Sequence, residues 1–220
     1  MSMFTAMIRK LHFEGVGTLS DIELLALFLA GGDPVHRPDA LLEATRFIGP
    51  FGGLRGLLEA AKDGDANDTI TAPDLARFKV LGELARRYFA QSLGPGTRVD
   101  SPERVSEFLR GRLLDRDRES FGCLFVDARH RALAFEVLAL GTIDGAVVYP
   151  REVVRATLRH AAQAVIVAHN HPSDSATPSA VDRAITTRLK AALELIDVAL
   201  LDHVIVTRTQ CVSMAGLGIL

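Results

Sequence analysis

The sequence predicts an α/β (α+β) protein, with a small all-helical N-terminal domain followed by a domain built on a mixed β-sheet. Only helical segments are recognisable in residues 1–92, whereas strand-like and helical segments alternate in residues 101–220. Between them, Ser92-Leu-Gly-Pro-Gly-Thr97 has the composition of a linker, so we expect residues 93–100 to join the two domains. With 48% hydrophobic and 24% charged residues, the chain of 220 residues has an ordinary globular composition.

We expect four helices in the N-terminal domain. Ser20 or Asp21 is a plausible N-cap for the first of them, and Gly31-Gly-Asp-Pro34 ends it. The polar stretch 62–71 contains glycine and asparagine and predicts a loop before the last helix. The four predicted helices cover residues 22–30, 38–47, 54–61 and 72–91.

The second domain alternates helices and strands. Ser101-Pro102-Glu103 starts a helix that runs to about residue 113, because proline is favoured at the first helical position. The apolar, β-branched run Ala164–Ala168 predicts a buried strand. The other predicted strands are 121–127 and 132–140, which form a hairpin, a short piece at Val147-Val148, and the closing antiparallel pair 198–207 and 211–214. Further helices are predicted from Pro150 to about residue 163 and from Pro178 to about residue 195.

Two histidines and an aspartate follow the buried strand with the spacing of a metal site. On a strand, His169 and His171 point to the same face with Cα atoms roughly 6.5 Å apart. Pro172 ends the strand, and Asp182 falls in the first turn of the next helix, where it can fold back over the strand end. Two imidazoles and a carboxylate, with a fourth position left for water, form the ligand set of a catalytic zinc.

Each of these residues also has a structural interpretation. A histidine at a strand end is usually a hydrogen-bonded core or edge residue. Ser179-x-x-Asp182 also has the form of a helix N-terminus, with Ser179 as the N-cap. The whole arrangement, His-x-His, seven residues, Ser, two residues and Asp, is similar to the JAMM metallopeptidase pattern in full, and we therefore expect Zn²⁺ at His169, His171 and Asp182.

Composition argues against several other classes of protein. The net charge is −2, and the Lys/Arg and Asp/Glu counts are 11 and 12 in residues 1–98 and 14 and 15 in residues 99–220, so nucleic-acid binding has no support from a basic excess. The first 14 residues lack the apolar core of a secretory signal, and no segment has the length of a membrane span. Cys123 and Cys211 are too few for a disulfide framework, so we expect both to be buried, reduced thiols. We therefore expect a reducing compartment, the cytoplasm.

Several motifs together resemble the RadC family, whose bacterial members are described as DNA repair proteins. The resemblance covers nearly the whole chain and implies a degenerate helix-hairpin-helix domain at residues 1–92. It further implies a RadC-type JAB/MPN metalloprotease-like domain, with a cytidine-deaminase-like layered fold, at residues 101–220. The matching motifs are Leu19-Ser-Asp21, Glu23-Leu-Leu-Ala26, Phe51-Gly-Gly-Leu-Arg55, Gly141-Thr142, Pro150-Arg-Glu152, His169-Asn-His-Pro-Ser173, Thr177-Pro-Ser179, Asp182 and Asp202-His203.

The chain departs from the family pattern at two places. Asp174 stands where the family usually has glycine, which adds an acid beside the expected metal site. The family's helical part normally carries a Gly-Ile-Gly turn whose backbone N–H groups hold a DNA phosphate. This chain has Ala72-Pro-Asp-Leu-Ala-Arg-Phe-Lys79 in that region, so its DNA binding is in question.

The resemblance also implies a glutamate that serves as general base. Glu119 precedes the first strand in the expected Glu-x-Phe context, and Glu136 in the second strand is the competing candidate. We expect Glu119, whose structural alternative is a surface acid paired with Arg118 or Arg116. Ser179 would donate a hydrogen bond to the oxyanion.

Two further residues near the expected metal site have roles left open by the sequence. Asn170 faces away from the ligands and would be structural. His203 either hydrogen-bonds one of the metal ligands without touching the ion, or is a packed core histidine.

Three functions are compatible with these residues. The first is a zinc metallopeptidase (hydrolase) acting on a protein or peptide substrate through peptide or isopeptide bonds. The second is a DNA-repair-associated factor that binds DNA, which the missing glycine pair and the acidic balance disfavour. The third is an interaction scaffold in which the metal serves stability alone. We expect the first, with no membrane partner and with the oligomeric state left open.

Overall fold

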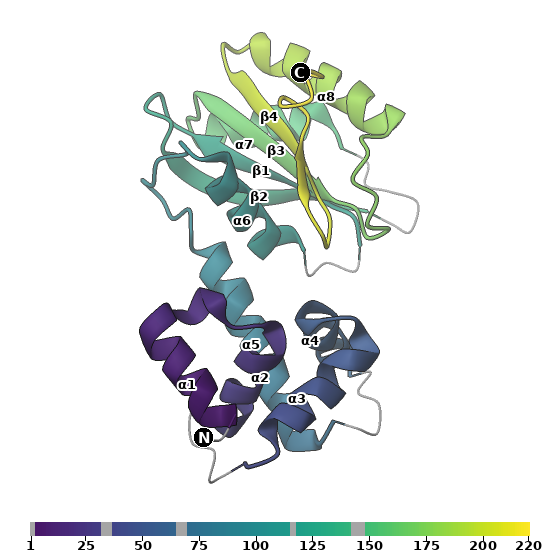
Figure 1. Ribbon diagram of the computed structural model, residues 1–220. Helices are drawn as coiled ribbons and strands as arrows, with labels where there is room; N and C mark the ends of the chain where they lie inside the picture. The colour runs from purple at the N-terminus through teal and green to yellow at the C-terminus, as the bar shows by residue number, and fades with distance from the viewer. Residues whose placement is uncertain (1–2, 32–36, 65–69, 115–117, 142–147) are drawn as a thin grey trace. The chain divides into compact units, whose positions relative to one another are not determined.

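The computed structural model describes residues 3–31, 37–64, 70–114, 118–141 and 148–220, and these form two compact units, Met1–Ala85 and Arg86–Leu220 (Figure 1). The predicted linker, residues 93–100, is hydrogen-bonded into the second unit. Gly96 N donates to Ala132 O (2.8 Å), Ala132 N to Thr97 O (2.8 Å) and Val99 N to His130 O (2.7 Å). Residues 96–99 therefore pair with residues 130–132, which lead into the second strand of this unit's sheet.

The first unit consists of short helices around one core. Ser20 and Glu23 form a reciprocal capping box at the start of α2, which confirms the predicted N-terminus. Leu25, Phe47, Leu57 and Phe78 are buried in this core, with the rings of Phe47 and Phe78 in an edge-to-face contact. The helices are α1 (Met3–Glu14), α2 (Asp21–Ala30), α3 (Ala40–Ile48), α4 (Leu54–Asp63) and α5 (Ala72–Ala90), with 3-10 turns η1 (Val16–Thr18) and η2 (Gly49–Phe51).

The four predicted helices are confirmed as α2 to α5, whereas α1 was not predicted. Its apolar residues Phe4, Met7, Ile8 and Leu11 recur at helical spacing, and this is a signal that the sequence interpretation missed; Met7 alone among them is fully buried. Gly31 ends α2 in the left-handed conformation (φ 61°), as expected of a C-cap glycine. The rest of the predicted breaker, residues 32–34, and half of the predicted loop 62–71, namely residues 65–69, lie outside the described residues.

The second unit is built on a five-stranded sheet in the order β2-β1-β3-β4-β5. Neighbouring strands are antiparallel except for β3 and β4, which are parallel, so the predicted mixed sheet is confirmed. The strands are β1 (Ser120–Val126), β2 (Ala132–Leu140), β3 (Ala164–Asn170), β4 (Ala199–Val206) and β5 (Cys211–Ser213). Val148 is not part of a strand, and Val147 lies outside the described residues.

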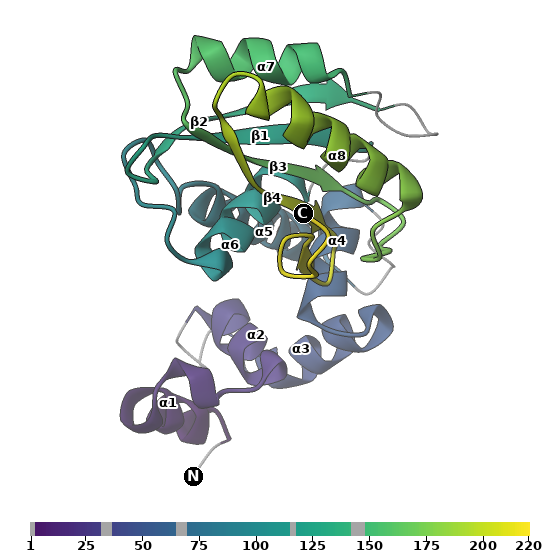
Figure 2. The ribbon, with the colours of Figure 1, turned by 90° about the horizontal axis from the view of Figure 1, so that it is seen from above.

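Helices cover both faces of this sheet (Figure 2). The helix α6 (Pro102–Leu113), capped by Ser101, lies on one face, where Phe108 and Leu109 share a core with Leu124 and Ile166. The helices α7 (Pro150–Arg159) and α8 (Ala180–Glu194) lie on the other face and close a second core. The central strands β1 and β3 are buried along their whole length, as the apolar run of β3 predicts.

The parallel pair β3–β4 needs a crossover, and α8 supplies it. The chain leaves the carboxyl end of β3, turns, and begins α8 beside that strand end. Residues from the end of one strand and the start of one helix therefore meet at a single edge of the sheet. Within the part of the chain that the structure describes, no helix combines the length and the apolar character needed to cross a lipid bilayer.

Candidate metal centre

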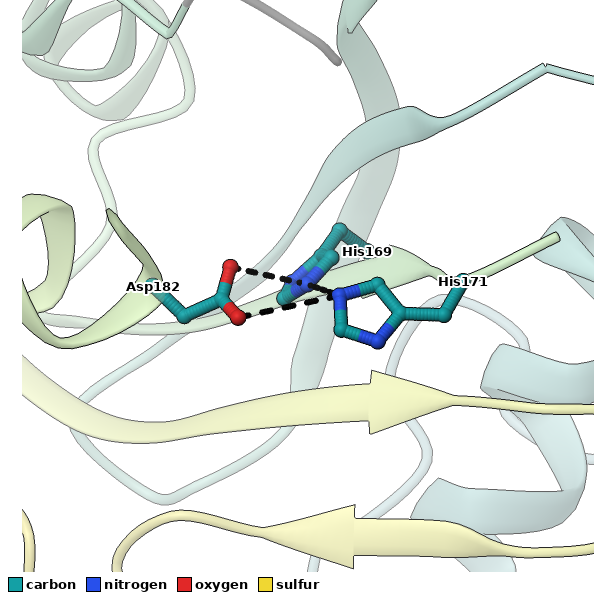
Figure 3. A group of neighbouring side chains, drawn as sticks. All are labelled: His169, His171 and Asp182. Atoms are coloured by element: carbon teal, nitrogen blue, oxygen red, sulfur yellow. Dashed lines mark hydrogen bonds and ion pairs between the residues drawn. The ribbon is translucent and has the colours of Figure 1, made fainter. Parts of the chain in front are cut away.

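The end of β3 and the first turn of α8 bring His169, His171 and Asp182 together (Figure 3). His169 lies within β3, and His171 follows the strand directly, its N–H still bonded to Val206 O of β4 (2.9 Å). Asp182 is the third residue of α8. Among the described residues, these form the one group of three or more His, Cys, Asp or Glu side chains whose ligand atoms all lie within 4.8 Å of one another.

The separations between the ligand atoms suit a small divalent cation. His169 Nε2 lies 3.1 Å from Asp182 Oδ1, and His171 Nε2 lies 3.6 Å from Asp182 Oδ2. The two Nε2 atoms are 2.8 Å apart. In a tetrahedral site with zinc–ligand bonds of ~2.0–2.1 Å, neighbouring ligand atoms are ~3.3 Å apart. The observed values bracket that separation, so the donor set fits a zinc ion.

Asp182 is held by the helix cap as well as by the histidines. Ser179 N and Ser179 Oγ both donate to Asp182 Oδ2 (2.7 and 2.6 Å), and Asp182 N donates back to Ser179 Oγ (3.1 Å). Burial alone would raise the pKa of Asp182, but its interaction with the His169 ring and the hydrogen bonds from Ser179 outweigh burial and hold the pKa well below its usual range. The carboxylate is therefore ionised, as a metal ligand must be.

The two interpretations of Ser179-x-x-Asp182, as a helix cap and as part of a metal site, are therefore compatible. The cap sets the position of the acid, and the free face of the acid points at the two imidazoles (Figure 3). Ser179 is exposed, and its hydroxyl hydrogen lies on Asp182. The predicted contact of Ser179 with an oxyanion would need this hydrogen to turn outward, and it stays a prediction.

Neighbouring groups orient both rings. His171 Nδ1 lies 2.6 Å from Ser175 O, and because a carbonyl oxygen only accepts, Nδ1 carries the hydrogen. His169 Nδ1 lies 2.8 Å from His203 Nε2. His203 is fully buried on β4, and burial, with a smaller contribution from His169, lowers the pKa of His203 to about 3. His203 is therefore a buried core histidine that also hydrogen-bonds the candidate ligand His169, so its two predicted roles are compatible.

Thr186 completes this group and was not predicted. Its Oγ1 donates to Asp182 O (2.6 Å) and lies 2.5 Å from His203 Nδ1. A spacing of four residues after Asp182 puts Thr186 on the same face of α8, which is the signal that could have found it.

Glu119 and Glu136 differ in their surroundings. Phe121 pairs with His169 across β1 and β3, and Glu119 lies two residues earlier, just before β1 begins at Ser120. Strand alternation, if extended by one residue beyond β1, predicts that Glu119 shares the face of Phe121 and His169. Glu136 lies on the edge strand β2, where its carboxylate binds His160 Nε2 (2.6 Å) and Arg159.

The choice of Glu119 as general base stays a prediction. Arg118, one of its two possible ion-pair partners on the surface, is exposed. The other, Arg116, lies outside the described residues.

Asn170 holds the backbone on both sides of Glu119. Its Oδ1 accepts from Ser120 N (2.8 Å), and its Nδ2 donates to Arg118 O (3.2 Å). Glu119 O in turn accepts from Gly141 N (2.7 Å), so the start of β1 is bonded to both of its neighbours. The structural role expected of Asn170 is thus the attachment of the Glu119 segment to the end of β3.

The unusual acid Asp174 occupies a left-handed backbone position, with φ 61°. Glycine adopts this conformation most readily, which explains why the RadC-family pattern has glycine at this position. Aspartate tolerates it because its side chain can bond locally, and Asp174 Oδ1 accepts from Arg208 N (2.6 Å). The carboxylate therefore ties the turn after His171 to the β4–β5 connection rather than joining the three ligands.

Solvent reaches the centre from the side of His171. The side chain of His171 is 15% exposed, compared with 2% for His169. Ser179, which is exposed, bonds Asp182 Oδ2, the same carboxylate oxygen that lies nearest His171 Nε2. A catalytic zinc needs one position free for water or substrate, and a structural one is closed by four protein ligands. Three ligands with an open side match the catalytic arrangement.

The fold and these clustered ligands define a JAB-type α/β domain with a candidate metal site. The family model for the RadC-like JAB domain matches residues 99–219. The chain is also similar to the UPF0758 protein of Stutzerimonas stutzeri (strain A1501), with 48% identity over 210 residues, 95% of this chain and 93% of the relative. The UPF0758 protein of Halorhodospira halophila (strain DSM 244 / SL1) is 46% identical over 213 residues, 96% of this chain and 94% of that protein. The chain belongs to the RadC-like family, to which these UPF0758 proteins also belong.

Proposed function

We propose that the protein is a zinc-dependent hydrolase of JAMM type that cleaves peptide or isopeptide bonds. The observation that carries this proposal is the geometry of His169, His171 and Asp182, whose ligand atoms lie at tetrahedral separations with one side open to solvent. Zinc bound there supplies a Lewis acid that polarises a carbonyl and makes water a nucleophile at neutral pH.

The chain's own residues supply the remaining steps. Glu119, two residues before the residue that pairs with His169, accepts a proton from the attacking water and returns it to the leaving amine. Ser179 turns its hydroxyl from Asp182 to the substrate and donates to the oxyanion, a contact worth about 3 kcal/mol in the transition state.

Metal content and hydrolysis measured on the same variants test the proposal. The purified chain should bind one zinc and cleave members of a mixed peptide library or Nε-linked lysine isopeptides, with products identified by mass spectrometry. His169→Ala and Asp182→Ala should lose both zinc and cleavage. A zinc-loaded wild type that cleaves neither class of substrate would contradict the proposed function.

Variants of the two glutamates separate the candidate bases. Glu119→Gln should keep zinc and lose at least about 100-fold in rate, the lower end of what a general base contributes. Glu136→Gln should keep both, because this carboxylate is bound to Arg159 and His160. Glu152→Gln is the matched control, since Glu152 pairs only with surface arginines among the contacts described. If Glu136→Gln lost hydrolysis and Glu119→Gln kept it, Glu136 on β2 would be the general base instead.

DNA binding remains the main alternative and is tested with duplex and branched DNA over a range of salt. The first turn of α5 argues against it. Asp74 there binds Arg37 and accepts from Thr71 Oγ1 (2.8 Å), so a carboxylate occupies the helix start that would otherwise face a phosphate. Salt-dependent binding at physiological ionic strength, without hydrolysis, would favour the alternative.

A further inference from the structure

Three hydrogen bonds connect the backbone of α8 to the ring of His169. Thr186 Oγ1 lies 2.6 Å from Asp182 O and 2.5 Å from His203 Nδ1, and His203 Nε2 lies 2.8 Å from His169 Nδ1. All four residues are buried, with His203 fully so. The series begins at the backbone of Asp182 and ends at the ring that faces the Asp182 carboxylate.

The chemistry of the first bond fixes the direction of the others. Asp182 O can only accept, so Thr186 spends its single hydroxyl hydrogen on it. Thr186 Oγ1 must then accept from His203 Nδ1–H. A neutral His203 has its lone pair on Nε2, which accepts from His169 Nδ1–H. Neutral His169 then has its lone pair on Nε2, the nitrogen that faces His171 and Asp182, where a bound cation would lie between the three groups.

We infer that Thr186 and His203 are positioning residues that hold His169 in the one tautomer able to bind a metal ion. In the other tautomer, His169 Nε2 carries a hydrogen in the space where the cation must sit. The inference rests on the proposed metal site but assigns a role to two residues that touch neither ion nor substrate. Asp182 takes part twice, through its carboxylate at the site and through its carbonyl at the start of the series.

Zinc affinity of Thr186 variants of the full-length chain tests this role. Thr186→Val keeps the shape of the side chain and removes the hydroxyl, so zinc affinity should fall by about 10- to 100-fold, as for other groups that orient a ligand. Thr186→Ser keeps the hydroxyl and should restore wild-type affinity. Thr187→Val is the matched control, because exposed Thr187 makes the same type of bond, to Arg183 O (3.0 Å), away from the site.

Imidazole ¹⁵N chemical shifts of the metal-free chain provide a second measurement, which a purely structural role would not change. The wild type should show hydrogen on Nδ1 of both His169 and His203. A His169 Nδ1 that carries no hydrogen would overturn the inference even if Thr186→Val failed to fold. Equal zinc affinity of folded Thr186→Val and wild type would overturn the inference alone, whereas a wild type that binds no zinc would overturn the proposed function with it.

Discussion

At the scale of single residues, Asp174 is a position where backbone conformation limits the choice of side chain. At φ 61°, an Asp174→Ala substitution should destabilise the fold by about 1–2 kcal/mol, because alanine has no side-chain bond to offset the left-handed conformation. Asp174→Gly removes the bond to Arg208 N but relieves the backbone, and should stay within about 1 kcal/mol of wild type. Urea denaturation measures both variants. An alanine variant as stable as the glycine variant would contradict this account.

Asn170 should contribute to stability through its two hydrogen bonds to the backbone around Glu119. Asn170→Ala leaves the buried N–H of Ser120 without its acceptor, so the free energy of unfolding should fall by about 1–3 kcal/mol. Release of the Glu119 segment should also lower hydrolysis per bound zinc. Gln163→Ala, at the exposed residue just before β3, is the control. Wild-type stability and hydrolysis in Asn170→Ala would show that the two bonds are dispensable.

Asp74 predicts a pH dependence in the helical domain. Hydrogen bonds from Arg37 hold the pKa of Asp74 below its usual value, so Asp74 stabilises the fold fully above pH ~4, where an unfolded aspartate is ionised. That contribution is lost as the pH falls through the lower, folded pKa. Asp74→Asn should therefore cost about 1–3 kcal/mol at pH 7 and progressively less below pH 4.

Denaturation of the full chain at pH 7 and pH 3 measures this change. Asp39→Asn, at an exposed acid whose side chain does not cap α3, is the control and should leave stability unchanged at both values. A cost for Asp74→Asn that stays constant with pH would contradict the assignment.

The three ligands could be predicted from sequence because they belong to one strand end, one turn and one helix start, which are close along the chain. The positions of Thr186 and His203 could not be predicted in the same way. His203 arrives on β4, and its place beside β3 depends on the register that pairs it with Val167. Thr186 has the pattern of any threonine on a helix. The four-residue spacing places Thr186 beside Asp182, but its contact with His203 depends on the non-local pairing of β3 with β4.

At the scale of elements, Gly111 sets how closely α6 approaches the last turn of α5. A Cβ at Gly111 would lie 2.5 Å from Ala90 N and 2.9 Å from Phe89 C, which are backbone atoms that cannot rotate away. Gly111→Ala should cost about 1–3 kcal/mol, although alanine favours a helix. Thermal denaturation measures this change.

Gly82→Ala gives the opposite expectation in the interior of α5. Nothing described lies within 4 Å of the added Cβ, and the helix should gain about 0.5–1 kcal/mol. The two substitutions should therefore differ in sign. Stabilisation by Gly111→Ala would mean that α6 is free to move.

The elements themselves could largely be predicted, since α2 to α8 and all five strands follow from caps, periodicity and apolar runs. Their ends were less certain. The helix α7 ends at Arg159, earlier than expected, and Ala161 then adopts a left-handed conformation with φ 48°. Alanine rarely adopts this conformation, so the sequence gives no signal for the end of the helix.

At the scale of the whole molecule, zinc should stabilise the chain by mass action. At a free zinc concentration about 100 times the dissociation constant, the free energy of unfolding should rise by about 2.7 kcal/mol. EDTA should reverse the shift in melting temperature, and Asp182→Ala should show none. An equal shift in Asp182→Ala would mean that zinc binds elsewhere.

The cap that holds Asp182 also bears on when the ion arrives. Small zinc fingers stay unfolded until metal comes, because their ligands have no other support. Here Ser179 fixes the acid, Ser175 fixes one ring and His203 fixes the other, and none of these contacts involves a metal ion. We therefore expect the chain to fold before zinc binds, so that the supply of zinc determines how many folded copies hold the ion.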